Sequence, residues 1–264
     1  MKNNKKIYFV SDAHLGFPNY EQSLKREKLL VEWLDKIKLD AEEIYLMGDL
    51  FDFWFEYKKV IPRGFTRFLG KIAEITDSGI PVHFFTGNHD IWIFDYLPKE
   101  IGIILHKEPI VKIFNNKVFY LAHGDGLGPH DKGFKFLKKI FTSPFYQWFF
   151  TRLHPNFGVG SAQYWSLKSR YAKAKRPGEY DFKGIEDEWL VQYSRKLLEE
   201  KHFDFLIYGH RHVPLDFKVS ETSRHINLGD WLANFTYGVF DGINFELLNY
   251  KTPDWSDIYG SKEK

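Results

Sequence analysis

Side chains that bind metal ions well occur in five short motifs along this chain of 264 residues. Each motif contains Asp, Asn or His, and each directly follows an apolar run typical of a buried β-strand. Loops at strand ends are places where a rigid sheet can direct several side chains to one point. The candidate ligands are Asp12, His14, Asp49, Asn88, His123, His210 and His212.

This ligand set predicts a centre with two divalent ions, which lie roughly 3.5–4 Å apart in such sites and share a carboxylate. Carboxylate, imidazole and amide groups together suit Mn²⁺, Fe²⁺ or Zn²⁺ better than Ca²⁺. We expect Asp49 to bridge the two ions. The remaining ligands fall into two sets, the first being Asp12, His14 and His212 and the second Asn88, His123 and His210. The spacings Asp-x-His and His-x-His are expected to place both side chains on one face of a strand end.

Each motif taken alone has a plainer explanation. Gly, Asn and Asp dominate turns, and a single His-x-His on a strand is usually ordinary surface chemistry. The coincidence of all five motifs, each after an apolar strand, favours the metal site and predicts cleavage of a phosphoester.

The elements that would hold these motifs alternate between strand and helix, which predicts an α/β fold with a largely parallel, buried sheet. The expected helices are 20–37, 65–75 and 185–201. Asn115-Asn116 predicts a hairpin turn, and so does Asp241-Gly242. The C-terminal strands are expected to form a β-meander over 214–219, 225–228, 235–240 and 244–250.

The bulk composition narrows the class of protein. The hydrophobic content of 44% is enough for a sizeable core, and the absence of cysteine excludes disulfides, thiolate metal sites and thiol catalysis. No apolar stretch reaches the roughly 18 residues of a membrane span, and the first residues lead directly into a strand. We therefore expect a protein that is made and kept in the cytoplasm.

The segment from Asp131 to Gly178 does not follow the alternation of strands and helices. It holds ten Lys or Arg against one acidic residue, a local charge of +9, together with twelve aromatic residues. Such a block favours an anionic, partly apolar partner, although the aromatics could also form a small core of their own under a solvated basic face. The expected domains are a core of 1–125 and 185–251, a helical cap insertion of 126–184 and a loose tail of 252–264.

The five motifs resemble those of the calcineurin-like metallophosphoesterases. They are Ser11-Asp12-Ala13-His14, Gly48-Asp49-Leu50-Phe51-Asp52, Gly87-Asn88-His89-Asp90, His123-Gly124-Asp125 and Gly209-His210-Arg211-His212. The resemblance implies a four-layer α/β/β/α sandwich with a dinuclear centre, commonly loaded with Mn²⁺, at the carboxyl edge of the sheet. It also implies that His89, held by Asp90, lies close to the phosphate, where it can protonate the leaving group or stabilise the phosphate. An adjacent carboxylate would raise the pKa of this histidine and fix its tautomer, whereas the plainer reading is a histidine that caps the turn.

Two further features resemble the UDP-2,3-diacylglucosamine diphosphatases of bacterial lipid A synthesis. One is the aromatic run from Phe51 to Tyr57, and the other is the basic, aromatic insertion that follows His123-Gly124-Asp125. In that family a helical cap and the core enclose the sugar and acyl chains. The resemblance implies substrate contacts from Asn88, His89, Asp131, Ser169, Lys173, Arg176 and His210. The chain departs from the best-known members at His89, where they carry Arg.

The resulting expectation is a hydrolase that releases UMP and 2,3-diacylglucosamine 1-phosphate at the cytoplasmic face of the inner membrane. A related enzyme acting on another pyrophosphate, a nucleotide or a phosphoprotein remains an alternative, as does a non-catalytic adaptor at an anionic membrane surface. Nucleic acid is not expected as a partner, because the pI is only about 8.4 and the basic block is local. The sequence does not indicate an oligomeric state.

Overall fold

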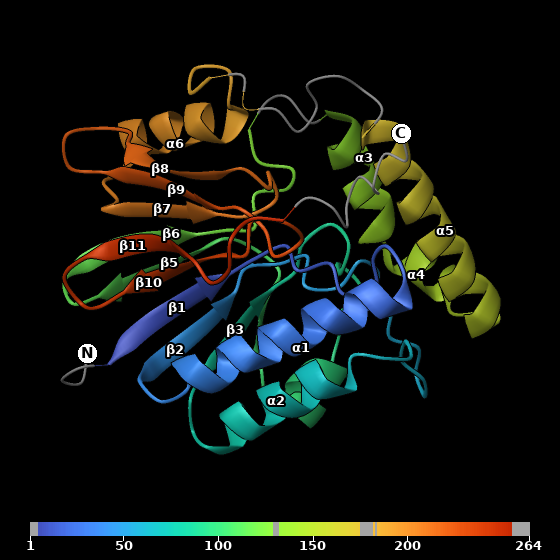
Figure 1. Ribbon diagram of the computed structural model, residues 1–264. Helices are drawn as coiled ribbons and strands as arrows, with labels where there is room; N and C mark the ends of the chain where they lie inside the picture. The colour runs from blue at the N-terminus through green and yellow to red at the C-terminus, as the bar shows by residue number, and fades with distance from the viewer. Residues whose placement is uncertain (1–4, 129–131, 175–181, 183, 255–264) are drawn as a thin grey trace, which may run out of the picture.

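The computed structural model describes residues 5–128, 132–174, 182 and 184–254. Two β-sheets pack face to face, with α1 and α2 on the outer face of one and α6 on the outer face of the other (Figure 1). This arrangement confirms the predicted α/β class and its four-layer α/β/β/α sandwich. The outer helices are α1 (Tyr20–Ile37), α2 (Thr66–Asp77) and α6 (Trp189–Glu200).

Both sheets mix parallel and antiparallel pairs. The first has the order β11 (Phe245–Asn249), β10 (Thr236–Phe240), β1 (Lys6–Val10), β2 (Ala41–Leu46), β3 (Val82–Phe85) and β4 (Ile104–His106). The second has the order β5 (Ile110–Phe114), β6 (Lys117–Leu121), β7 (Phe205–Tyr208), β9 (Arg224–Leu228) and β8 (Pro214–Lys218). A short π-helix, η1 (Leu97–Ile101), precedes β4.

The central strands are buried on both faces, which explains why they read as continuous apolar runs. In β1, Ile7 and Phe9 pack between the two sheets, while Tyr8 and Val10 pack against the outer helices. Successive side chains of a strand point to opposite faces, so one strand contributes to two cores.

The parallel strands place several chain segments at one edge. β1, β2 and β3 run parallel in the first sheet, and β6, β7 and β9 run parallel in the second. We call the edge where these six strands end the carboxyl edge. Three further helices lie together beyond it (Figure 1), namely α3 (Lys132–Phe141), α4 (Pro144–Phe150) and α5 (Pro155–Ala174).

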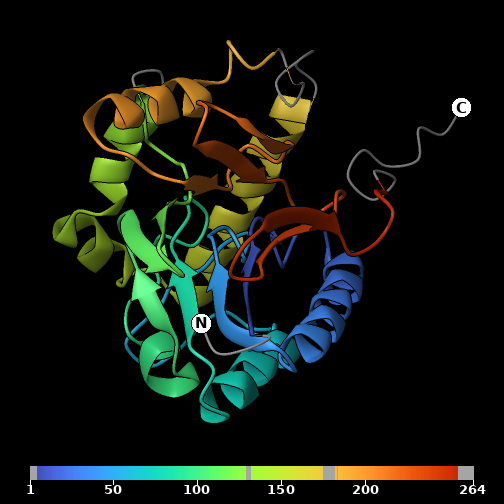
Figure 2. The ribbon, with the colours of Figure 1, turned by 90° about the vertical axis from the view of Figure 1, so that its left-hand side faces the viewer.

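Figure 2 looks at the sandwich from the opposite end. From that side the parallel strands of both sheets run away from the viewer toward α5, which lies behind the two sheets. Within the described ranges, no helix combines the length and apolar character that crossing a bilayer requires.

The prediction of helix 20–37 is confirmed at both ends. Asn19 caps the N-terminus, since its side-chain oxygen accepts from the backbone N–H of Gln22 at 3.0 Å. Leu30, Trp33 and Leu34 form the buried stripe against the first sheet. The Asn115-Asn116 turn is also confirmed, with φ of 46° and 64° between β5 and β6.

Three expectations are wrong. The sheets are mixed rather than largely parallel. The C-terminal strands do not form a meander, because β9 pairs in parallel with β7 and the chain then crosses to the other sheet, where β10 pairs with β1. Local alternation identifies a strand but carries no information on which sheet it joins. Helix α6 begins at Trp189 rather than at residue 185, and the intervening residues form a turn.

Candidate active site

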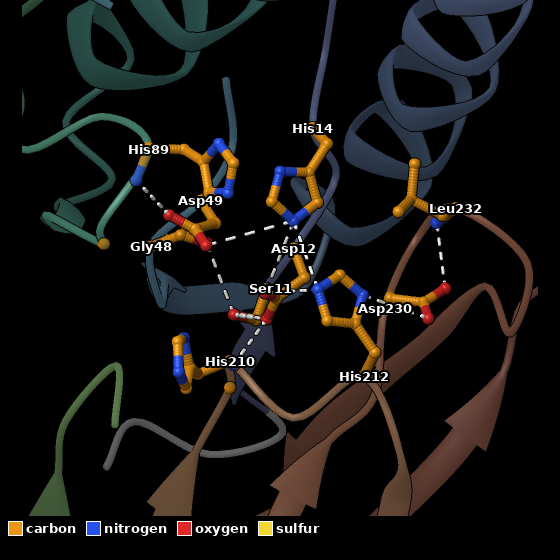
Figure 3. A network of polar contacts seen from close by, with 12 residues as sticks. Ser11, Asp12, His14, Gly48, Asp49, His89, His210, His212, Asp230 and Leu232 are labelled. Carbon is orange, nitrogen blue, oxygen red and sulfur yellow. Dashed lines mark hydrogen bonds and ion pairs between the residues drawn. The ribbon is translucent and has the colours of Figure 1, made fainter. Parts of the chain in front are cut away.

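The loops at the carboxyl edge bring metal-binding side chains together (Figure 3). Possible ligand atoms lie within 4.8 Å of one another in three groups, which share members. The groups are Asp12, His14 and His212; Asp49, His123 and His210; and His14, Asp49 and His89. The first group is the first predicted ligand set. The second group contains His123 and His210 of the second predicted set, together with Asp49 rather than Asn88. Asp49 also belongs to the third group.

Five of the seven proposed ligands have left-handed backbone conformations. The φ values are 56° for Asp12, 42° for His14, 53° for Asp49, 69° for His210 and 57° for His212. The argument that Asp-x-His and His-x-His lie on one face of a strand is therefore wrong, because these residues follow the strands. Each non-glycine residue in such a conformation costs about 1–3 kcal/mol, so the surrounding structure must hold it in place.

Arg26 of α1 holds the first of these loops. Its side chain is buried and donates to the carbonyl oxygens of Ala13 at 2.7 Å, His14 at 2.9 Å and Phe17. The three hydrogen bonds fix the backbone around His14. This role could not be predicted from the sequence, because Arg26 lies inside a helix in which arginine is a common residue.

Two glycines allow the ligand loops to approach each other. A Cβ atom on Gly48, whose φ is 97°, would lie 2.5 Å from Nδ1 of His123. A Cβ atom on Gly87 would lie 2.2 Å from Oδ1 of Asp49. Any side chain at these positions would displace a proposed ligand.

Buried polar atoms without hydrogen-bond partners test whether the site fits metal ions. Among the described residues, such atoms include Oδ1 of Asp12, Oδ1 of Asn88 and Nε2 of His123. All three belong to residues that the sequence nominated as ligands. An unsatisfied buried polar atom costs about 1–3 kcal/mol, and a bound cation would supply the missing partner. The donor set thus fits divalent cations.

The partners of Asp12 explain why one of its oxygens is left over. Its Oδ2 accepts from the backbone N–H of His210 at 2.9 Å and from the hydroxyl of Ser11. Its Oδ1 lies 3.6 Å from Nε2 of His14 and 3.5 Å from Nε2 of His212. These distances are too long for hydrogen bonds and are those expected of ligands around a common centre.

Outer contacts orient the imidazole rings. Nδ1 of His123 lies 2.8 Å from the carbonyl oxygen of Met47, which can only accept, so Nδ1 carries the proton and Nε2 faces the other ligands. Nδ1 of His212 lies 3.4 Å from Oδ2 of Asp230. The carboxylate of Asp230 is itself held by the backbone N–H groups of residues 232–234.

Sequence reasoning missed Asp230, although a signal was present. Gly229-Asp230 directly follows β9, just as Gly48-Asp49 follows an apolar run. A search for Gly-Asp after apolar strands would have found it.

The charges in the site are strongly coupled. Burial acts to raise the pKa of Asp49, yet the positive charges of His123 and His89 hold it well below its usual range. Burial lowers the pKa of His123, but Asp49 outweighs burial and raises it to about 10. Burial raises the pKa of Asp12 as well. A bound cation would displace the proton of His123, because metal ligation requires the neutral imidazole.

Asp90 does not hold His89 as expected. Its carboxylate accepts from the backbone N–H groups of Gly87 at 2.7 Å and Leu50 at 2.9 Å, and burial together with Asp49 raises its pKa to about 7. Asp90 therefore joins two ligand loops. Nδ1 of His89 instead lies 2.8 Å from the carbonyl oxygen of Asp52.

The remaining substrate-binding predictions are not tested by the structure. Asp131 and Arg176 lie outside the described residues. Ser169 and Lys173 belong to α5, whose backbone is described there, but their side chains are not. Asn88, His89 and His210 do lie at the carboxyl edge beside the metal-binding groups.

Comparison with known proteins identifies relatives along most of the chain. The family model for calcineurin-like phosphoesterase matches residues 5–214. A UDP-2,3-diacylglucosamine hydrolase of Porphyromonas gingivalis is 42% identical over 252 residues, covering 92% of this chain and 96% of that protein. A UDP-2,3-diacylglucosamine hydrolase of Actinobacillus succinogenes is 26% identical, with 86% of this chain and 92% of that protein covered.

A solved structure of vacuolar protein sorting 29 from Cryptosporidium parvum also matches. It is 15% identical with a TM-score of 0.43, and the match covers 92% of this chain and 89% of that one.

Proposed function

The chain belongs to the calcineurin-like phosphoesterase family and is a metal-dependent hydrolase, and on that premise we propose that it cleaves the pyrophosphate of UDP-2,3-diacylglucosamine. The products are UMP and 2,3-diacylglucosamine 1-phosphate. This reaction places the protein in lipid A synthesis.

One observation carries the substrate assignment. The Porphyromonas gingivalis hydrolase matches 92% of this chain, and the unmatched part is too small to contain the helices α3–α5. The similarity therefore extends beyond the phosphoesterase core into the part of the chain that would select the substrate.

The ligand geometry supports two ions joined by Asp49. Oδ2 of Asp49 lies 3.3 Å from Nε2 of His123 and 3.9 Å from Nε2 of His14, and these histidines belong to different ligand sets. Two divalent ions in such a site supply a nucleophile near neutral pH and neutralise charge on the phosphoryl oxygens. We propose Mn²⁺ as the metal, since carboxylate, amide and imidazole ligands suit it.

His89 acts on the substrate rather than on the backbone turn in this proposal. Its backbone N–H donates to Oδ1 of Asp49 at 2.8 Å, which places the residue beside the proposed bridge. Its Nδ1 donates to the carbonyl of Asp52, and we propose that Nε2 is the ring nitrogen that acts on a phosphoryl oxygen. Asp90 supports this arrangement by joining the loops on either side.

We further propose that residues 126–184 form a cap, with α3–α5 as its described helices, and that residues 252–264 are a tail outside the core. The cap carries large apolar side chains at the surface, and half or more of each of several aromatic side chains is exposed. They are Phe136, Phe145, Tyr146, Trp148, Phe149, Phe157, Tyr164 and Trp165.

Basic groups accompany these aromatics. The guanidinium of Arg152 lies 4.8 Å from the ring centre of Trp148, and the ammonium of Lys168 lies 5.8 Å from that of Trp165. Apolar and cationic groups side by side suit acyl chains and an anionic membrane surface, where each basic residue contributes about 1 kcal/mol. We propose that the protein works at the cytoplasmic face of the inner membrane and that Asp131, Ser169, Lys173 and Arg176 contact the sugar and phosphates.

The experiment compares UMP release from UDP-2,3-diacylglucosamine and from its deacylated counterpart, with the purified protein and Mn²⁺. The proposal expects kcat/KM to be at least about a hundredfold higher for the diacylated substrate, because acyl burial supplies about 25 cal/mol per Å². Equal rates would contradict an acyl-binding cap and would favour another pyrophosphate or a nucleotide as substrate.

A further inference from the structure

Asp52 is a buried carboxylate that links three parts of the site. Its Oδ1 lies 3.7 Å from Nδ1 of His14 and 3.8 Å from Nδ1 of His89. Its Oδ2 accepts from the hydroxyl of Ser166 on α5 at 2.9 Å. Its carbonyl oxygen lies 2.8 Å from Nδ1 of His89. One residue therefore lies beside a proposed metal ligand, beside the histidine proposed to act on the substrate, and in contact with α5.

Ser166 also approaches the histidine directly. Its hydroxyl oxygen lies 3.5 Å from Nδ1 of His89, close to the proton that this nitrogen donates to Asp52. Because the Ser166 hydroxyl donates its only hydrogen to Asp52, its oxygen can act toward Nδ1 of His89 only as an acceptor. The serine therefore completes the surroundings of Nδ1 and favours one tautomer and one ring orientation.

The contact between α5 and the core is open around Ser166. A cavity of about 290 Å³ separates the 15–19 loop from residues 163, 164 and 167 of α5, and Asp52 lines it. Close packing does not set the position of the helix relative to this loop, and the hydrogen bond from Ser166 to Asp52 is a specific contact between the helix and the core.

We propose that Asp52 and Ser166 are positioning residues that make the orientation of His89 depend on the seating of α5. With α5 seated, the Nδ1 side of His89 is enclosed and Nε2 is directed to the substrate. With α5 displaced, the ring loses its contact with Ser166 and turns more freely. The inference rests on the proposed function only in assigning His89 a part in hydrolysis.

The first test compares two serines of the same helix. Ser161 donates to the carbonyl of Gly158 within its own helix at 3.1 Å and serves as the matched control. Ser166→Ala is expected to lower kcat about tenfold with KM changed less than twofold, as for other outer contacts of active-site histidines. Ser161→Ala should leave both unchanged, and Ser166→Thr, which keeps the hydroxyl, should recover most of kcat.

The second test is a double-mutant cycle with His89→Ala, in which bound metal is measured for every variant. If Ser166 acts through His89, Ser166→Ala has no further effect once the histidine is gone, and metal content stays at the wild-type value throughout. Four results would overturn the proposal. The first two are an unchanged kcat in Ser166→Ala and a tenfold loss of kcat when Ser166→Ala is added to His89→Ala. The others are a change in Ser166→Ala that is confined to KM and a loss of bound metal in any variant.

The cycle is run with UDP-2,3-diacylglucosamine and with bis-p-nitrophenyl phosphate. Hydrolysis of the second compound needs only the family's phosphodiesterase chemistry. If the protein hydrolyses the aryl compound but not the nucleotide sugar, the proposed function is rejected. If the effects of Ser166→Ala and His89→Ala on hydrolysis of the aryl compound are additive, the role of Ser166 is rejected.

Discussion

The carboxyl edge and the proposed cap, with its helices α3–α5, differ in how their side chains are held. At the edge, Asp12, His14 and Asp49 are buried, have strained backbones and are held by several hydrogen bonds. In the cap, Trp148 and Phe149 of α4 are more than half exposed. At the edge, strained backbone conformations lower the stability of the fold but hold the side chains in a fixed geometry. In the proposed cap, apolar surface remains exposed to solvent.

This difference separates chemistry from substrate handling. A dinuclear centre requires ligands held to within about 0.5 Å, which short loops at the ends of a rigid sheet can provide. A lipid-bearing substrate needs apolar surface that remains accessible until it binds. Changes at the edge should therefore affect turnover and metal content, and changes on the exposed face of the cap should affect substrate or membrane affinity with little effect on folding.

The largest effect is expected from Asp49→Asn. The amide cannot replace a carboxylate that joins two cations, so kcat should fall by about a thousandfold or more. Asp95→Asn, which removes an exposed carboxylate paired with Lys99, is the matched control and should keep wild-type activity. Near-normal turnover in Asp49→Asn with metal bound would remove Asp49 from the centre.

A smaller effect is expected from Asp230→Asn. The substitution removes the charge beside Nδ1 of His212, and loss of such an outer partner costs about 10–100-fold in metal affinity. Titration of the metal-free protein with Mn²⁺ measures this loss. Unchanged affinity would mean that backbone contacts alone orient His212.

The cap prediction uses two neighbouring positions of α4. Trp148→Ser combined with Phe149→Ser should lower binding to anionic vesicles about tenfold, with a change in the free energy of unfolding within about 0.5 kcal/mol. Phe150→Ser is the contrasting variant, since the centre of the Phe150 ring lies 4.5 Å from that of Phe55 and 5.0 Å from that of Trp92. This substitution should lower the free energy of unfolding by about 2 kcal/mol. Vesicle binding that survives the double substitution would place the membrane contact elsewhere.

The smallest effect concerns His225, a buried histidine at the base of α6. Burial lowers its pKa to about 3, and Oγ of Ser194 lies 2.9 Å from its Nδ1. Because the folded state holds it neutral, its contribution to stability is present above the unfolded pKa of about 6.5 and is lost as pH falls toward about 3. Between pH 7 and 6 the loss is roughly 0.7 kcal/mol. Chemical denaturation of His225→Gln should show a correspondingly flatter pH dependence, and an unchanged slope would contradict this.

The positions of the candidate ligands were more predictable than the contacts that hold them. Six of the seven candidates, all except Asn88, lie close to one another at the carboxyl edge, because apolar runs locate strand ends and parallel strands end together. The strained backbone at His14 and His212 was not predictable, since left-handed conformations at non-glycine residues depend on tertiary contacts. The roles of Arg26 and Asp52 were missed for the same reason. Arg26 contacts a loop that precedes its helix, and Asp52 contacts Ser166 of α5.

The fold was predictable up to strand pairing. The helix from Tyr20 to Ile37 has a cap, a buried stripe and no breaker, so its ends are fixed locally. The crossing from β9 to β10 was missed: β9 pairs with β7 in one sheet, and β10 pairs with β1 in the other. Which sheet each joins depends on the two packed cores, and a local pattern does not contain that information.

The most direct test of the account is the metal content of three proteins. After loading with Mn²⁺ and removal of the unbound ion, the wild type should retain two ions per chain. His123→Ala and His212→Ala, which remove one ligand from each set, should each retain about one ion. A wild type that retains one ion or none, or a variant that keeps both, would contradict a dinuclear centre at the carboxyl edge.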